Sequence, residues 1–91
     1  MEITRVVNIR SSKYDYYIGR PSMLGNPFRI GQGGSREEVI QKFREYFYAR
    51  IDTDCKFREL VLSLAGKILG CYCKPKACHG DIVAEYLNGV L

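Results

Sequence analysis

The segment Cys71–Asp81 concentrates the side chains that could do chemistry. Its sequence, C-Y-C-K-P-K-A-C-H-G-D, follows an apolar strand pattern and precedes a helical one. Sheets in α/β proteins bind ligands at such junctions, because the free N–H groups of a helix start attract anions. We therefore predict an anion site here. The candidate catalytic residues are His79, Cys78 and Asp81, and the neighbouring ligand contacts are Cys73 and Gly80.

Other interpretations of this segment stay open. Cys78 or Cys73 could act as a nucleophile, since a helix amino end and His79 would lower a thiol pKa. A zinc site built from Cys71, Cys73, Cys78 and His79 has suitable ligand types, but C-x-C-x4-C-H lacks the usual paired spacing. We therefore predict no metal and no other cofactor. Asp81 could equally serve as a helix cap.

A second segment, Gly19–Phe28, has the composition of a rigid binding loop. Pro21 and Pro27 fix the backbone, while Arg20 and Asn26 offer donors to an anion or a base edge. The alternative is that the Asn26 side chain only holds its own turn.

The charges are unevenly distributed along the 91 residues. The net charge is +4, and residues 1–36 hold six Lys or Arg residues against two acidic ones, whereas residues 37–91 hold eight of each sign. The whole excess lies in the first part, which favours an anionic partner there.

The length predicts one domain, 1–91, with a single core. No apolar run approaches the ~18 residues of a spanning helix, and the first residues do not resemble a signal peptide. We therefore expect no membrane contact and a cytoplasmic location in which the cysteines stay reduced. Cys55, inside a helical pattern, is expected to be a buried packing thiol.

Two strands are predicted before the long loop. Ile3–Arg10 contains a β-branched run typical of a central strand, and Tyr14–Gly19 resumes the pattern after a short polar link. Such a link suits a hairpin, so we expect these strands to be antiparallel neighbours. Residues 20–34, rich in Gly and Pro, are expected to form a loop.

Helical patterns dominate the rest of the chain. Ser35 and Glu38 form an S-x-x-E capping box before an apolar stripe of Val39, Ile40, Phe43, Phe47 and Ile51. The segment Asp52-Thr53-Asp54 interrupts this helix and can cap a second one with the stripe Phe57, Leu60, Val61 and Leu64. A strand over Lys67–Cys73 and a helix over Asp81–Asn88 follow.

This order of elements predicts an α/β fold. We expect a small two-layer or three-layer sandwich, with a short mixed sheet of about three strands and about three helices. The third strand should join the first in parallel through the helical crossover.

The sequence resembles the uncharacterised phage and bacterial family known as domain of unknown function 4326. The resemblance lies in G-R-P-S at residues 19–22, G-N-P-F at 25–28 and C-H-G-D at 78–81, with further matches along most of the chain. It implies no activity. It does imply that a group of residues are neighbours at one end of the sheet: Asn8, Arg10, Arg20, Ser22, Asn26, Cys73, Cys78, His79 and Asp81.

Together these observations favour a protein that binds a phosphate-bearing, nucleotide-like small molecule near Cys73–Asp81, with transferase or hydrolase chemistry as an open extension. One alternative is a nucleic-acid-binding module that uses residues 5–36, with Tyr14, Tyr16 or Tyr17 stacking on bases. Another is a protein-interaction or inhibitory factor without catalysis, with the second strand as an exposed edge. A homodimer would cover apolar edges, and a viral origin would place the protein in the host cytoplasm.

Overall fold

The computed structural model describes residues 3–90. The elements follow in the order β1 (Arg5–Asn8), β2 (Tyr16–Tyr17), α1 (Arg36–Thr53), α2 (Cys55–Ser63), β3 (Ile68–Cys71) and α3 (Gly80–Val90). The predicted α/β class is confirmed, and the order of strands and helices is the predicted one.

The sheet has β3 in the middle, in the order β1-β3-β2. Both pairs are parallel, with Val6 opposite Leu69 and Tyr17 opposite Gly70. The parallel pairing of the first and third strands is therefore confirmed. The antiparallel hairpin of the first two strands is wrong, so the sheet is parallel rather than mixed, and β1 is an edge strand rather than the central one.

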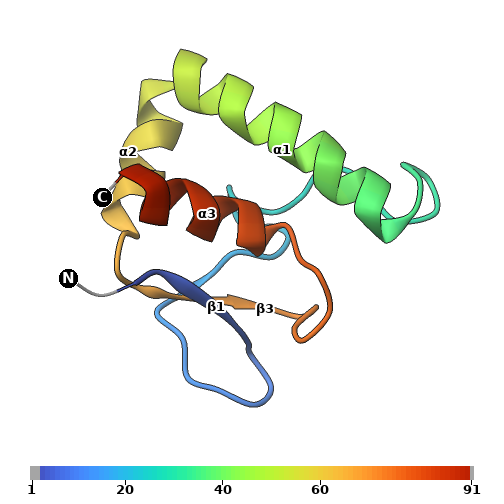
Figure 1. The fold of residues 1–91 in the computed structure, drawn as a ribbon, viewed down its shortest axis with the longest axis horizontal. Helices are drawn as coiled ribbons and strands as arrows, with labels where there is room; N and C mark the ends of the chain where they lie inside the picture. Colours follow the sequence, from blue (N-terminus) through green and yellow to red (C-terminus); the bar gives the residue numbers. More distant parts are fainter. Residues whose placement is uncertain (1–2, 91) are drawn as a thin grey trace.

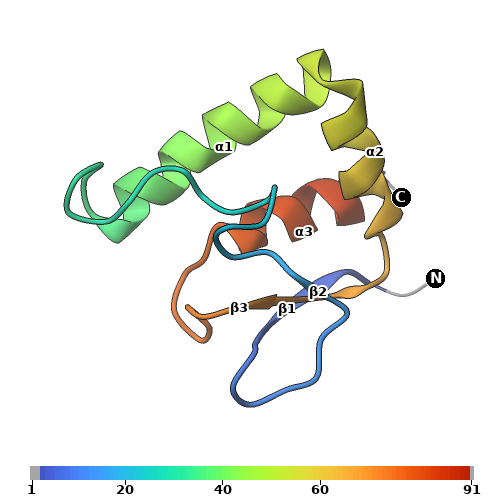
Figure 2. The same cartoon turned by 180° about the vertical axis from the view of Figure 1, so that it is seen from behind.

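Gly70 explains why the hairpin does not form. The segment between β1 and β2 crosses β3 on the side of the sheet opposite the helices (Figures 1 and 2). A Cβ at Gly70 would lie 2.6 Å from Ile9 Cγ2 and 2.7 Å from Tyr14 Cγ. The missing side chain at Gly70 lets this crossover lie directly on β3, and it brings β2 to the far edge in a parallel direction.

The first helix begins and packs as its sequence predicts. Ser35 Oγ accepts from the Glu38 N–H at 3.2 Å, and the Glu38 carboxylate accepts from the Ser35 N–H at 3.0 Å. Four of the predicted stripe residues of α1 are buried, namely Val39, Phe43, Phe47 and Ile51. The fifth, Ile40, is half-buried. Within the predicted capping segment 52–54, Asp54 is the residue that caps α2, by accepting from Phe57 N–H at 3.1 Å, while α1 continues through Thr53.

All three helices cover one face of the sheet, and α3 lies between the sheet and α1 (Figures 1 and 2). The core fills this space. Its largest fully buried side chains are Phe43, Phe47, Phe57, Ile18, Leu24, Leu69 and Leu87. The core therefore fixes the start of α3 against the end of β3, where the thiols and the histidine lie.

Cys55 is exposed, so its predicted role as a packing thiol is wrong; it is the first residue of α2 and lies outside the apolar stripe. No helix in residues 3–90 is long and apolar enough to cross a membrane.

Candidate functional site

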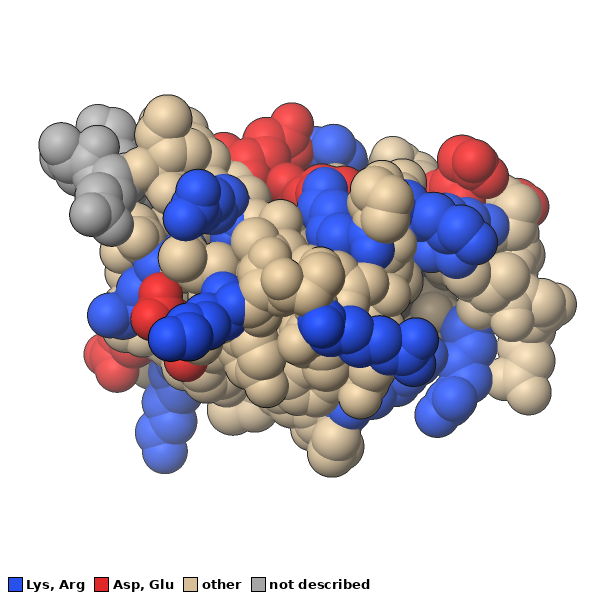
Figure 3. Space-filling model, turned by 90° about the horizontal axis from the view of Figure 1, so that it is seen from below, with Lys and Arg blue, Asp and Glu red and all other residues tan. Residues whose placement is uncertain are grey.

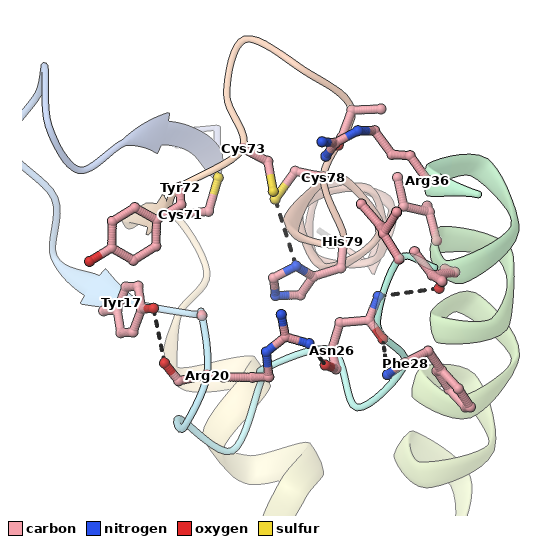
Figure 4. Close-up of a pocket in the computed structure, with 15 residues that line it drawn as sticks. Tyr17, Arg20, Asn26, Phe28, Arg36, Cys71, Tyr72, Cys73, Cys78 and His79 are labelled. Atoms are coloured by element: carbon pink, nitrogen blue, oxygen red, sulfur yellow. Dashed lines mark hydrogen bonds between the residues drawn. The ribbon is translucent and has the colours of Figure 1, made fainter. Parts of the chain in front are cut away.

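A pocket of about 320 Å³ opens beside the carboxyl end of β3. Its walls come from β2 and the loop that follows, from the first turns of α1, and from the turn between β3 and α3 (Figure 4). The lining residues are Tyr17, Gly19, Arg20, Asn26, Phe28, Ile30, Arg36, Val39, Ile40, Cys71, Tyr72, Cys73, Ala77, Cys78 and His79. The two segments singled out in the sequence therefore meet at one cavity.

Arg20 and Asn26 shape one wall of the pocket. Arg20 Nη1 donates to the Asn26 carbonyl oxygen at 3.0 Å, and the guanidinium extends toward the His79 ring (Figure 4). The buried Asn26 amide donates to Val39 O at 3.2 Å, and its oxygen accepts from Phe28 N–H at 2.9 Å. Asn26 thus holds its own loop against α1, and Arg20 is the residue of this pair with donors to offer a ligand.

The turn before α3 is built as a helix cap. The Asp81 carboxylate accepts from Cys78 N–H at 3.1 Å, and Cys78 Sγ accepts from Gly80 N–H at 3.3 Å. The Asp81 contact is the reach-back half of a capping box, while the sulfur accepts from Gly80 rather than from the Asp81 N–H. Asp81 also pairs with Lys74 Nζ at 2.5 Å, which raises the pKa of Lys74 through that hydrogen bond. Asp81 therefore makes a helix-capping hydrogen bond, the role that the sequence analysis gave as the alternative to catalysis.

The amino end of α3 has little to offer an anion. The N–H of Gly80 is held by the Cys78 sulfur, and the N–H of Asp81 by the Cys78 carbonyl oxygen at 3.0 Å. Both N–H groups already donate to acceptors within the turn. An anion in this pocket would therefore be bound by arginine side chains instead.

Asn8 and Arg10 lie outside the pocket and support its rim. The Asn8 amide donates to Tyr72 O at 3.2 Å and to Lys74 O at 2.7 Å. The Arg10 guanidinium lies 5.4 Å from the centre of the exposed Tyr72 ring. Ser22 is also absent from the lining, and its buried Oγ has no hydrogen-bond partner within the described residues.

His79 is buried and uncharged at neutral pH. Burial lowers its pKa below the usual value. Its Nε2 lies 2.8 Å from Ile18 O, an atom that can only accept, so Nε2 carries the proton. The lone pair of Nδ1 then faces Cys78 Sγ at 3.7 Å. His79 is thus a hydrogen-bond acceptor toward the thiols and not a cation for the ligand.

The thiols Cys71 and Cys78 act on each other's ionisation. Interaction with the Cys78 thiol, together with N–H groups of Lys74 and Cys73, lowers the pKa of Cys71 to about 6. The same interaction, together with burial, raises the pKa of Cys78.

Five residues that were predicted from sequence to belong to the site line the pocket: Arg20, Asn26, Cys73, Cys78 and His79. Arg36, Phe28 and Cys71 were not predicted as pocket residues. Arg36 is the first residue of α1, and its Nη1 donates to Ala77 O at 3.2 Å across the pocket. No local signal in the sequence marks Arg36, because its place in the pocket depends on a contact with Ala77, 41 positions later.

Among residues 3–90, no group of three or more His, Cys, Asp or Glu side chains is placed to hold a metal ion. The predicted lack of zinc stays a prediction.

Comparison with known proteins places the chain in a family. A family model described as "Domain of unknown function (DUF4326)" matches residues 1–89. A protein of Enterobacteria phage T4, named "Uncharacterized 12.4 kDa protein in nrdA-td intergenic region", is 41% identical over 87 residues, which cover 94% of this chain and 79% of the phage protein. No solved structure matches. The chain therefore belongs to the DUF4326 family, as the sequence motifs suggested.

Proposed function

We propose that the pocket binds a small phosphate-bearing molecule of the nucleotide class. The observation that carries the proposal is the charge of the lining: two arginines, Arg20 and Arg36, and no acidic residue among the described residues that form it. His79 adds no positive charge, since burial lowers its pKa. Guanidinium groups bind phosphate through paired N–H donors, which makes a phosphate group the best match.

The rest of the lining suits a flat, partly apolar group. Tyr17, Phe28 and Tyr72 contribute aromatic surface, and Ile30 and Val39 contribute aliphatic surface. Aromatic side chains stack on nucleobases at a gain of roughly 1–3 kcal/mol per base. Ligand pockets span roughly 300–1,000 Å³, and this cavity of about 320 Å³ matches one nucleotide unit rather than a dinucleotide.

Each arginine makes a hydrogen bond to the protein that does not use all of its N–H donors. Arg20 Nη1 bonds the Asn26 carbonyl and Arg36 Nη1 bonds the Ala77 carbonyl. A guanidinium has five N–H donors, so one bond to the protein orients the group and leaves donors for a phosphate. The two anchors lie on different walls of the pocket, which would let the arginines hold a phosphate between them.

Isothermal titration calorimetry with the ribonucleoside 5′-monophosphates and their parent nucleosides tests this function. We expect saturable binding of at least one monophosphate and much weaker binding of the matching nucleoside. Arg20→Ala and Arg36→Ala should each raise the Kd about tenfold or more, because a charged hydrogen bond contributes roughly 1.5–3 kcal/mol. Lys56→Ala, on the exposed side of α2, removes the same charge away from the pocket and should leave the Kd unchanged. Absence of saturable binding to every monophosphate would contradict the proposal.

A second candidate function is binding of single-stranded nucleic acid outside the pocket. Tyr72 is 56% exposed and carries the Arg10 guanidinium over its ring, and Tyr14 on the crossover is 43% exposed. Figure 3 shows this side of the molecule, where Lys and Arg side chains outnumber acidic ones. Exposed aromatic rings among cations are typical of surfaces that stack on bases.

Salt dependence separates the two candidates. Binding of an oligonucleotide through several phosphates should weaken steeply between 50 and 200 mM salt, on the order of 10³-fold or more for six contacts. A pocket that holds one phosphate should show a much smaller slope. An oligonucleotide affinity that is lost in Arg10→Ala, with monophosphate binding absent, would favour the second candidate.

A further inference from the structure

A thiol and an imidazole that the proposed binding function does not use lie side by side in the wall of the pocket. Cys78 Sγ lies 3.7 Å from His79 Nδ1, a hydrogen-bond distance for sulfur, and both residues line the cavity (Figure 4). Cys78 is only 1% exposed, and its thiol is free. A molecule bound in the pocket would therefore meet a free thiol that has a base as its neighbour.

The His79 ring is oriented to accept the proton of this thiol. Its Nε2–H donates to Ile18 O at 2.8 Å, which leaves the lone pair of Nδ1 facing the sulfur. The ring also packs edge-on against Phe43, with the two ring centres 5.0 Å apart. Burial lowers the pKa of His79, so the ring is uncharged and free to accept a proton. A nucleophile beside a base that a third group orients is the arrangement by which covalent catalysis activates cysteine.

The turn before α3 holds the sulfur of Cys78 and would stabilise negative charge on it. The Gly80 N–H donates to Cys78 Sγ at 3.3 Å, and the Asp81 carboxylate fixes the Cys78 backbone by accepting its N–H at 3.1 Å. A hydrogen bond from an N–H strengthens when its acceptor becomes ionised. The Cys71 thiol, together with burial, raises the pKa of Cys78, so the resting group is a thiol and its proton must leave during attack.

The charge of the same cavity selects the kind of molecule that this thiol would meet. Arg20 and Arg36 line it, and no acidic residue is among the described residues that form it. The Arg20 guanidinium extends toward the His79 ring (Figure 4). An anionic group held by these arginines would place the rest of the same molecule within the cavity that Cys78 lines.

We propose that Cys78 is a nucleophile that attacks an electrophilic carbon of an anionic molecule bound in this pocket, with His79 as its general base. The Cys78 sulfur gives an electron pair to a new S–C bond while its proton moves to His79 Nδ1. The bond from that carbon to the leaving group breaks with its pair on the leaving group, which then takes the proton from His79. The step ends with a covalent S–C adduct on Cys78 and an uncharged imidazole.

This inference rests on the proposed function only for the anionic group of the molecule attacked, the phosphate that the arginines would hold. The reactivity of Cys78 itself can be measured without any nucleotide. Failure of the one can therefore be told apart from failure of the other.

Timed alkylation of the reduced full chain at neutral pH, with iodoacetate and separately with iodoacetamide, measures the rate at each cysteine by peptide mass spectrometry. Both reagents lose iodide from carbon, but only iodoacetate is an anion. We expect iodoacetate to label Cys78 before Cys71, Cys73 and the exposed Cys55. The ratio of the iodoacetate rate to the iodoacetamide rate should be about tenfold or more higher at Cys78 than at Cys55, since a cleft of one charge concentrates the opposite ion.

Two results with the unaltered chain would overturn the proposal, and neither needs a variant to fold. One is iodoacetate labelling that reaches Cys71 or Cys73 first, or that is slower at Cys78 than at Cys55. The other is the same ratio of the two reagent rates at Cys78 and at Cys55.

A variant of His79 tests the base. His79→Gln should lower the Cys78 rate with both reagents by about tenfold or more, because a general base contributes roughly 10²–10⁴-fold. A glutamine side chain can keep an N–H donor for Ile18 O but cannot take up a proton. The rate at Cys55, measured in the same tube, is the internal control and should not change. An unchanged Cys78 rate in a folded His79→Gln chain would contradict the assigned base.

A variant of Arg20 tests the site of the anionic group with the same two reagents. Arg20→Ala should lower the iodoacetate rate at Cys78 several-fold and leave the iodoacetamide rate there unchanged, because only the anion loses its attraction. Lys13→Ala, exposed on the crossover between β1 and β2, is the matched control and should change neither rate. Equal changes with the two reagents in Arg20→Ala would contradict an anion held by this arginine.

Protection separates this proposal from the binding function. Saturating AMP or GMP should slow the labelling of Cys78 by iodoacetate and leave Cys55 unaffected if a monophosphate occupies the pocket. Fast labelling of Cys78 without protection by any monophosphate supports the nucleophile and contradicts the nucleotide class of ligand. Protection of a Cys78 that reacts more slowly than Cys55 supports the binding function and overturns the nucleophile.

Discussion

The side-chain amide of Asn8 donates a 2.7 Å hydrogen bond to the carbonyl oxygen of Lys74, 66 positions away in the chain. The same amide donates to Tyr72 O at 3.2 Å, so the end of β1 holds the turn that follows β3. The N–H of Lys74 is one of the groups that lower the pKa of Cys71. Asn8 thus holds, from outside the pocket, the turn that contributes Tyr72 and Cys73 to its lining.

Replacing Asn8 tests this support. Asn8→Ala removes these two hydrogen bonds and the one that Asn8 Oδ1 accepts from the Arg10 N–H, and it should lower the free energy of unfolding by about 1.5–4.5 kcal/mol, because each bond contributes roughly 0.5–1.5 kcal/mol. Asn8→Asp keeps the acceptor for the Arg10 N–H but turns a carboxylate toward two carbonyl oxygens, so its cost should be at least as large. Urea denaturation measures both. Lys13→Ala, exposed on the same crossover, should change the value by less than about 0.5 kcal/mol.

A side chain at Gly80 is predicted to destabilise the fold. A Cβ there would lie 2.5 Å from Ile18 Cδ1 and 3.1 Å from Val6 Cγ1, and because Ile18 is fully buried, a shift of its side chain disturbs the core around it. Gly80→Ala should therefore cost about 1–3 kcal/mol through overpacking. Gly89 lies in the same helix, and a methyl group there would meet nothing within 4 Å, so Gly89→Ala should stabilise by about 0.5–1 kcal/mol. Thermal unfolding of the two variants should thus shift in opposite directions, and equal shifts would contradict the packing described.

Stability is predicted to rise with pH between about 6 and 8. In this window the folded chain has lost the Cys71 proton, since that pKa is lowered to about 6, whereas the unfolded thiol keeps its proton to about 8.5. The unfolded state therefore binds more protons, and the free energy of unfolding increases with pH. The lowered pKa of His79 acts in the same direction, because its contribution is present above about pH 6.5 and is lost as the pH falls.

Above about pH 8.5 the sign reverses, since the raised pKa of Cys78 favours the state that holds the proton and that stability is lost as the pH rises. Urea denaturation under reducing conditions at several pH values measures this rise and fall of the free energy of unfolding. Cys71→Ser should flatten the rise between pH 7 and 8 while Cys55→Ser leaves it intact. A flat or falling profile of the unaltered chain from pH 6 to 8 would contradict the lowered pKa of Cys71.

The helices could be predicted from sequence because their signals are local. Ser35 and Glu38 are three residues apart, and the buried residues Val39, Phe43 and Phe47 follow at helical spacing. Packing on one face and capping at one end are decided within a few turns, so a single segment carries the information.

The sheet order could not be predicted in the same way. β2 is only two residues long, and whether it pairs with β1 or β3 depends on Gly70, more than 50 positions later, which leaves room for the crossover. The pocket could be predicted only in part for a similar reason. Arg20, Cys78 and His79 belong to recognisable segments, whereas Arg36 enters the site only because the first turn of α1 lies across from Ala77.

The central claim is that a phosphate-bearing, nucleotide-like molecule occupies the pocket at the end of β3. Titration of the ¹⁵N-labelled chain with AMP and GMP, followed by ¹H–¹⁵N correlation spectra, reports both binding and its place. We predict saturable shifts at amides of the pocket lining, among them Gly19, Arg20, Tyr72 and Ala77, with Lys56 and Glu59 on α2 unmoved. Spectra that do not change at millimolar nucleotide, or that change only along the crossover at residues 9–15, would contradict the claim.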